Sequence, residues 1–398
     1  MKHLLIPLFC ILFISCESNK ATFSVDDYLH VIDLSKTEPV NMNLSKLFVN
    51  ITPIILETTK ESLLGSINKV VVTSEYIIVL DAVIAKALFL FKKDGTFLRK
   101  FGRIGLGPGE YSLISDFYYD TTTGTIYMLD ARIGKINLYN IHTGEFLKSI
   151  KLQSSNGVSR FICYQAGEIY ADLSYFTNEN GRYLLNRINQ STGRVEEAWF
   201  DLGTYSKNVD HIERNPFLIS DENSFKFNTC FMDGIMLVEK NKIIPFLAFT
   251  PEYTLNRSDL KSLDLKNITM NFYDELFKVN KVFNISTYFE YKDILFLQFN
   301  IGKTIRTVIY NQKTKDFKVV KVFFDDLFYS DINHFSFPSF LTCDDNGMYS
   351  RFGDWEMNIL KNDIEKDVIS DKYKSVAMDL ANLETDANPI LLYYEFKD

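Results

Sequence analysis

The chain has 398 residues, of which 46% are hydrophobic and 24% are charged, so its composition is that of a globular protein and not of a disordered or fibrous one. Aromatic residues reach 15%, which favours β structure. The formal net charge of −8 lacks the basic footprint that nucleic-acid binding requires, and we expect no nucleic-acid partner.

The first sixteen residues have the features of an export signal. Lys2 supplies a positive charge, and residues 4–13 form an apolar stretch that is too short to span a bilayer. Phe13-Ile14-Ser15-Cys16 then resembles a bacterial lipobox, in which the cysteine is lipidated and begins the mature protein. We therefore expect a lipoprotein signal peptide over 1–16, a membrane anchor on Cys16 in the cell envelope, and a tether with an N-terminal segment over 17–42. A plain secretory signal with an unrelated cysteine is the alternative.

A sequence pattern recurs with a spacing of 49 residues. Residues 76–81, 86–91 and 94–98 return as 126–130, 135–139 and 143–147. A third turn glycine, Gly193, lies 49 residues after Gly144. A period of about 40 to 50 residues built from short strands is typical of a β-propeller blade.

The apolar runs predict an all-β fold, a six-bladed β-propeller of four-stranded antiparallel blades over residues 43–398. The predicted strands are 67–72, 76–80, 87–91 and 96–101; 117–120, 126–129, 136–139 and 146–150; 161–164, 169–173, 184–189 and 195–200; 235–238 and 243–249; 285–291, 294–299, 304–310 and 317–323; and 340–343, 347–352 and 390–396. The last blade has only three strands of its own, so we expect the N-terminal run 51–56 to supply the fourth and to close the ring.

Helical insertions are expected to be small. Residues 201–227 are predicted to be a loop, and residues 258–279 have a partial helical period. A short helix is expected over 373–383, before Asn388-Pro389.

Three segments are similar to a family of bacterial six-bladed β-propeller lipoproteins that is abundant in gut Bacteroidetes and mostly uncharacterised. They are residues 43–59, the glycine-rich residues 101–111 (Phe-Gly-Arg-Ile-Gly-Leu-Gly-Pro-Gly-Glu-Tyr) and residues 388–393. The blades are also similar to NHL repeats. The resemblance implies the propeller fold, and it implies no activity.

The order of strands within a blade predicts a candidate site. The loop after a second strand and the loop leaving a fourth strand open on the same face. Asp81, Asp130, Arg132 and the glycine-rich loop are therefore expected around one mouth of the central channel. From that loop, Arg103, Glu110 and Tyr111 are candidates to bind a polar ligand.

These residues also have structural explanations. The loop matches neither a phosphate-binding nor a dinucleotide-binding motif, and its glycines would also permit a tight crossover between blades. Asp81 and Asp130 could instead accept hydrogen bonds from nearby backbone amides.

The function expected from the sequence is a binding or protein-interaction module, a monomer whose partner is an envelope protein or a glycan. The alternative is a hydrolase or lyase acting on carbohydrate or peptide, with Asp81 and Asp130 as acid and base. No catalytic residue, metal or cofactor is predicted, because the histidines lack zinc-ligand spacing. The two tryptophans, Trp199 and Trp355, do not indicate a sugar-binding platform, although tyrosines could form one.

Overall fold

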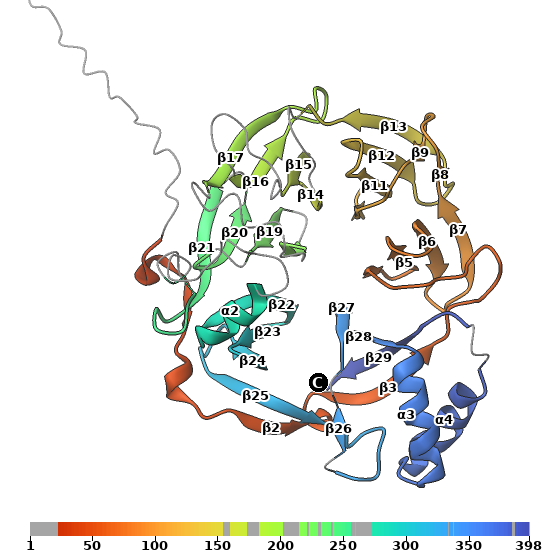
Figure 1. The fold of residues 1–398 in the computed structure, drawn as a ribbon, viewed down its shortest axis with the longest axis vertical. Coiled ribbons are helices and arrows are strands. Elements are labelled where there is room, and N and C mark those ends of the chain that lie inside the picture. The colour runs from red at the N-terminus through yellow and green to blue at the C-terminus, as the bar shows by residue number, and fades with distance from the viewer. Residues whose placement is uncertain are drawn as a thin grey trace, which may run out of the picture.

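The computed structural model describes residues 23–153, 160–172, 183–201, 215–220, 223–229, 232–239, 242–255, 259, 272–332, 334–336, 338–383 and 387–397. Six sheets of four or more strands stand around a central opening (Figure 1). This β-propeller arrangement is the one that the 49-residue period predicts. The expected signal peptide and Cys16 lie outside the described residues.

The first two sheets contain the two clearest copies of the repeat, and each is antiparallel with its strands in sequence order. The first contains β4 (Lys69–Val72), β5 (Tyr76–Asp81), β6 (Ala87–Lys92) and β7 (Phe97–Phe101), and the second contains β10 (Asp116–Asp120), β11 (Thr125–Asp130), β12 (Lys135–Asn140) and β13 (Phe146–Lys151). The hairpin glycines Gly95 and Gly144 have φ values of 93° and 76°, which glycine adopts without strain. The predicted hairpins are therefore confirmed.

The third and fourth sheets repeat the same order. The third contains β14 (Ile162–Gln165), β15 (Glu168–Ala171), β16 (Tyr183–Ile188) and β17 (Val195–Asp201), and the fourth contains β18 (Phe217–Ser220), β19 (Ser224–Phe227), β20 (Gly234–Glu239) and β21 (Lys242–Phe249). β18 and β19 correct the expectation that residues 201–227 form only a loop. In β19, Phe225 and Phe227 are buried while Ser224 and Lys226 are not, the period-two pattern of a strand with one buried face.

The fifth sheet is the largest. It contains β22 (Val282–Tyr291), β23 (Ile294–Ile301), β24 (Thr304–Asn311) and β25 (Phe317–Phe324), and β26 (Phe335–Ser336) also pairs with β25. The N-terminal segment adds two parallel strands to the outer edges of the fourth and fifth sheets. They are β1 (His30–Ile32) on β21 and β2 (Val40–Asn43) on β25, flanked by the short helices η1 (Val25–Asp27), η2 (Leu34–Lys36) and η3 (Leu44–Lys46). The tether predicted over 17–42 is therefore ordered against the propeller in its C-terminal part.

The sixth sheet joins the two ends of the chain. It contains β27 (Phe340–Asp344), β28 (Gly347–Phe352), β29 (Ile390–Phe396) and the N-terminal strand β3 (Phe48–Ile54). β3 runs antiparallel to β29, with Ile51 opposite Tyr394, which is the predicted closing pair. Phe48 is 1% exposed and stacks on Phe396, with 5.5 Å between ring centroids. The closing strand β3 thus contributes a side chain to the hydrophobic core.

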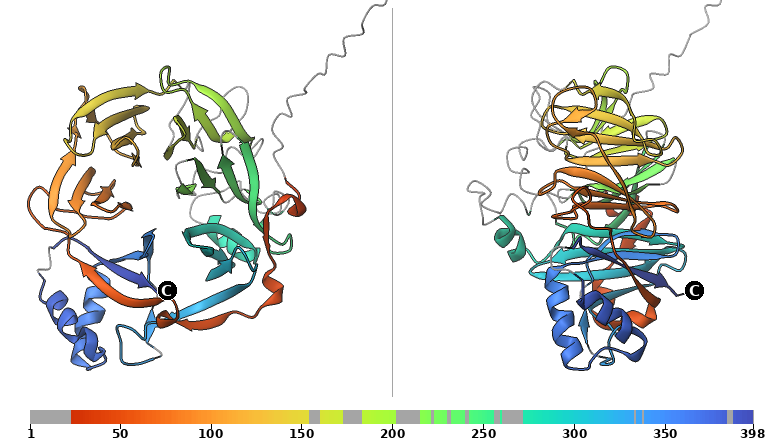
Figure 2. Two further views of the ribbon diagram at one scale, coloured as in Figure 1. Left: turned by 180° about the vertical axis from the view of Figure 1, so that it is seen from behind. Right: turned by 90° about the vertical axis from the view of Figure 1, so that its right-hand side faces the viewer.

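The helices stand outside the sheets. α3 (Asp354–Glu365), η6 (Asp371–Tyr373) and α4 (Lys374–Ala381) lie between β28 and β29 in sequence, at the outer side of the ring (Figure 2). α4 confirms the helix expected over 373–383, α3 was not predicted, and α2 (Phe272–Lys278) falls in the insertion expected to be partly helical. Among the described residues, no helix is long and apolar enough to cross a membrane.

The buried carboxyl group of Asp325, just after β25, should make stability depend on pH. Asp325 is 4% exposed and accepts the backbone N–H of Phe328 at 2.8 Å. Burial raises its pKa from 3.8 to about 6, so between these values the native state keeps a proton that the unfolded chain has lost. We expect the free energy of unfolding to fall as pH rises from about 4 to about 6, by about 3 kcal/mol. Urea denaturation at several pH values should show this slope in the native sequence and a flatter one in Asp325→Asn; equal slopes would contradict the assignment.

Candidate functional site

A central cavity of about 1970 Å³ opens between the sheets and could hold a ligand. Its lining includes residues from β4, β10, β14, β18, β22 and β27, one strand from every sheet. Each of these is a terminal strand of its sheet, and Figure 1 shows the labelled ones, β14, β22 and β27, on the side of the opening. Any molecule inside the cavity would therefore meet several blades at once.

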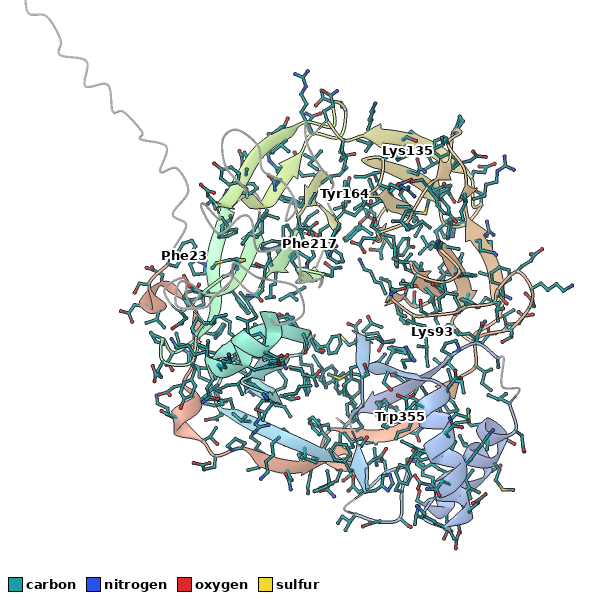
Figure 3. The ribbon with its side chains drawn as sticks, viewed as in Figure 1. Phe23, Lys93, Lys135, Tyr164, Phe217 and Trp355 are labelled. Carbon is teal, nitrogen blue, oxygen red and sulfur yellow. The ribbon has the colours of Figure 1, made fainter. Side chains whose placement is uncertain are left out.

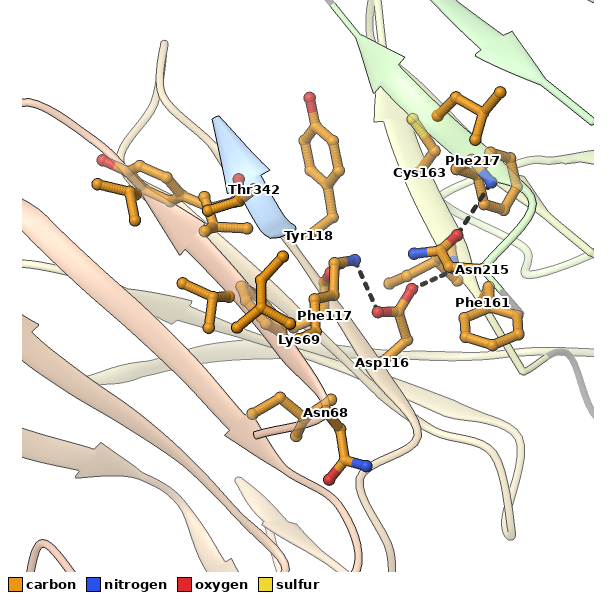
Figure 4. A pocket seen from close by; sticks show the side chains of 18 of the residues that line it. Asn68, Lys69, Asp116, Phe117, Tyr118, Phe161, Cys163, Asn215, Phe217 and Thr342 are labelled. Carbon is orange, nitrogen blue, oxygen red and sulfur yellow. Dashed lines mark hydrogen bonds and ion pairs between the residues drawn. The ribbon is translucent and has the colours of Figure 1, made fainter. Parts of the chain in front are cut away.

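An ion pair between a partly exposed lysine and a buried aspartate closes one part of the cavity wall (Figure 4). Lys69 Nζ of β4 lies 2.7 Å from Asp116 Oδ1 of β10 and donates to the Phe117 carbonyl at 2.6 Å. The other oxygen, Asp116 Oδ2, accepts the Ile162 N–H at 3.0 Å. Burial raises the pKa of the Asp116 carboxyl group, and the Lys69 ammonium opposes this shift. The Asp116 carboxylate of the second sheet thus binds Lys69 of the first sheet and the Ile162 N–H of the third. It connects three neighbouring sheets at their inner edges, where strand pairing ends.

Two more carboxylates of the cavity lining bind a lysine from an adjacent sheet. Glu290 of β22 lies 2.6 Å from Lys226 of β19, and Asp344 of β27 lies 2.9 Å from Lys93, just after β6. Although burial would raise the pKa of Asp344, hydrogen bonds from the Tyr349 hydroxyl and Lys93 lower it. Each of the three carboxylates, Asp116, Glu290 and Asp344, therefore has a lysine that balances its negative charge.

Aromatic side chains cover another part of the wall, on the second, third and fourth sheets. Tyr164 of β14 stacks on buried Tyr127 of β11, with ring centroids 4.6 Å apart and planes 20° apart. Tyr118 of β10 lies 6.2 Å from Tyr164. Tyr118, Tyr164 and Phe217 line the cavity and are only half-buried, and Figure 3 shows Tyr164 and Phe217 on the inner side of the ring.

The repeated aspartates have a structural role. Asp81 is fully buried and accepts the N–H groups of Gly65 at 2.7 Å and Ser66 at 2.9 Å, just before β4. Asp130 accepts the N–H of Ser112 in the same way. Asp172 accepts the N–H groups of Arg160 and Phe161, just before β14. Each aspartate therefore holds the segment that leads into an innermost strand.

This role removes the predicted acid–base pair. Burial alone would raise the pKa of Asp81, but hydrogen bonds from backbone amides and from Ser66 lower it. Asp81 and Asp130 belong to different sheets, and neither lines the cavity. The lowered pKa of Asp81 is the opposite of what a general acid requires.

The glycine-rich loop lies at the periphery and not at the channel mouth. β8 (Arg103–Ile104) and β9 (Glu110–Tyr111) pair in parallel, beside the outermost strand β7 (Figure 1). Lys135 of β12 donates to the Glu110 carbonyl at 2.7 Å, which holds the loop against the outer part of the second sheet. A loop that leaves an outermost strand begins far from the axis, and these contacts keep it there.

The six predicted ligand-binding residues do not form one site, because they are divided between the glycine-rich loop and the ends of β5 and β11. Arg103 is 82% exposed and pairs with Glu110 at 2.7 Å. The Gly107 amide and Arg103 lower the pKa of Glu110, whereas burial raises the pKa of Tyr111 to about 12. Arg132 is exposed at the turn after β11. None of the six predicted ligand-binding residues lines the cavity.

The sequence analysis missed the lining residues Lys69, Asp116, Tyr118 and Tyr164. One signal was available: Lys69 and Asp116 pair with Leu80 and Leu129, which are equivalent positions of the repeat. Opposite charges at one repeat position in consecutive blades indicate a contact between blades. The tyrosines give no such signal, because half-buried aromatic residues occur throughout the strands.

The described residues of the cavity provide no metal cluster, and the lining thiol of Cys343 is not reactive. No group of three or more His, Cys, Asp or Glu side chains in the described part of the chain could hold a metal ion. Burial raises the pKa of the lining thiol of Cys343 to about 12, so it is protonated at neutral pH and a poor nucleophile.

The fold and the cavity define a β-propeller with an axial cavity, and comparisons with known proteins agree. The chain belongs to the family described as "Domain of unknown function (DUF4934)", whose model matches residues 29–395. None of the curated proteins matches the chain.

Two solved structures from Bacteroides are similar. A protein of Bacteroides fragilis NCTC 9343 that is described as exported has a TM-score of 0.70 and 17% identity, over 92% of this chain and 100% of that one. A member of the DUF4221 family from Bacteroides vulgatus ATCC 8482 has a TM-score of 0.50 and 11% identity, over 88% of this chain and 97% of that one. At these identities the similarity shows the fold alone.

Proposed function

We propose that this protein is a lipid-anchored, six-bladed propeller of the cell envelope that binds a ligand in its central cavity. Each of the six sheets is one blade, and β3 closes the last. The export-type segment 1–16, with Cys16 in a lipobox-like sequence, supports the envelope location, as does the exported Bacteroides protein of similar fold.

The observation that carries the binding proposal is the cavity wall. It combines half-buried aromatic rings with polar side chains on a rigid ring of sheets, which is the composition of small-molecule sites. The three lysine-bound carboxylates and the amide-bound aspartates are occupied by structural partners. Binding without chemistry is therefore the function that these contacts favour.

Binding variants should distinguish the cavity from the glycine-rich loop. The chain without its signal segment (17–398) can be screened on glycan and peptide arrays. We expect a ligand found there to lose affinity in Tyr118→Leu and to bind normally in the double variant Arg103→Ala/Glu110→Ala, because only Tyr118 lines the cavity. Loss of binding in the double variant alone would place the site on the loop and overturn the proposal.

The anchor can be tested in cells. Cys16→Ala should move the protein from the membrane fraction to the soluble fraction, because a diacylated cysteine supplies the apolar surface that holds it in the bilayer. Fractionation followed by immunoblotting measures this, and Cys163→Ala is the matched control. Retention of Cys16→Ala in the membrane fraction would refute a lipid anchor at this position.

A further inference from the structure

We infer that the cavity ligand is an uncharged oligosaccharide, an inference that rests on the proposed binding function. The first observation is the charge balance of the wall. Three lining carboxylates, Asp116, Glu290 and Asp344, have lysine partners at 2.7, 2.6 and 2.9 Å. A charged ligand would have to break one of these pairs or remain uncompensated inside the cavity, and either is costly.

The remaining charged side chains of the lining stand at strand ends. Asp120 is the last residue of β10, and Asp345 lies in the turn after β27. Arg160 precedes β14 at the opposite ends of the strands. Asp120 is also occupied, because it accepts the Thr123 hydroxyl at 2.6 Å. These three side chains stand at the mouths, and the three other carboxylates of the described lining each have a lysine partner.

The second observation is the aromatic surface. Tyr127 is 5% exposed and stacks behind Tyr164, so it fixes the plane of a ring that lines the cavity. Tyr118 stands beside it at a tilt of 56°, and Phe217 adds apolar surface on the fourth sheet. The C–H face of a pyranose ring is apolar and flat, so it packs on such rings.

The third observation is the neutral polar groups around these rings. Asn215, Thr342 and Gln298 also line the cavity, and they can donate and accept hydrogen bonds without carrying charge. Sugar hydroxyls require partners of this kind once they leave water. The cavity of about 1970 Å³ is wider than the roughly 300–1,000 Å³ of a typical small-molecule site, so it has room for an oligosaccharide.

Calorimetric titration of the chain 17–398 tests the inference. The probes are maltohexaose, xylohexaose and laminarihexaose as neutral ligands, hexagalacturonate as an acidic ligand, and the peptide (Gly-Ser)₃. We expect at least one neutral oligosaccharide to bind, and its affinity to fall about tenfold in Tyr164→Ala. Trp355→Ala is the control, because Trp355 is a 70% exposed aromatic residue on α3, outside the cavity lining. Tyr164→Leu keeps the apolar volume if the alanine variant does not fold.

The outcomes separate the two claims. If only hexagalacturonate or the peptide binds, and Tyr164→Leu weakens it, the cavity is the site but the ligand class is wrong. If a neutral oligosaccharide binds and only Arg103→Ala/Glu110→Ala weakens it, the proposed cavity site fails as well. Failure of all three neutral probes to bind overturns the inference.

Discussion

Replacing Asp116 with alanine should lower the free energy of unfolding by at most about 3–5 kcal/mol, the cost of leaving one member of a fully buried ion pair without its partner, because the Lys69 side chain is 24% exposed. The Asp116 side chain is 1% exposed, and it accepts both Lys69 Nζ and the Ile162 N–H. Without this carboxylate, the Lys69 ammonium group and the Ile162 N–H would each lose a hydrogen-bond acceptor on the inner edges of two sheets. Urea denaturation followed by circular dichroism measures the change.

The ion pair Arg103–Glu110 is a matched control. Its N–O distance, 2.7 Å, equals that of Lys69–Asp116, but Arg103 is 82% exposed. Arg103→Ala should leave the denaturation midpoint almost unchanged, because water screens exposed pairs. The double variant Lys69→Ala/Asp116→Ala should lose less than the sum of the single variants, since neither charge is then left alone. If the denaturation midpoint of Asp116→Ala were close to that of Arg103→Ala, the Lys69–Asp116 pair would not contribute to holding the blades together.

Replacing Phe48 with alanine should cost about 3–5 kcal/mol, the range for a fully buried phenylalanine. Phe48 contributes to the core from the closing strand, where it packs against Phe340, Tyr394 and Phe396. Val49, the next residue, is 43% exposed, so Val49→Ala should change the denaturation midpoint little. The pair of variants separates packing by β3 from any general effect of changing the strand.

A deletion tests the closure itself. Removing residues 43–56 would delete β3 and leave an edge of β29 unpaired, so we expect loss of the cooperative melting transition. A deletion variant that melts like the full chain would show that the ring is held without its N-terminal strand.

Much of the fold could be predicted from the sequence because a blade is built from local contacts. In the first two sheets each strand pairs with the next one along the chain, so alternating apolar residues and turn glycines such as Gly95 and Gly144 define them. The errors fell where this pattern is weak. β18 and β19 are short, and β1 and β2 pair in parallel with strands more than 200 residues away.

The candidate site could not be predicted in the same way. Asp81 and Asp130 were candidates because strand order places them at one mouth of the channel. Residues that recur in every blade often stabilise the blade, however, and both aspartates accept hydrogen bonds from backbone amides. The glycine-rich loop was expected at the channel mouth because strand order alone gives the face on which a loop emerges. It does not give the distance from the axis, which the contact of Lys135 with Glu110 decides.

The sequence by itself determined the repeating unit, its turns and the closing strand, since each depends on the side chains of neighbouring strands. Only the tertiary structure decided what surrounds the axis. Lys69 and Asp116 are 47 residues apart, and Lys93 and Asp344 are 251 apart. Lys69 and Asp116 meet when consecutive blades pack together, and Lys93 and Asp344 meet only when the ring closes. Both contacts depend on the arrangement of the blades and not on the pattern within any one strand.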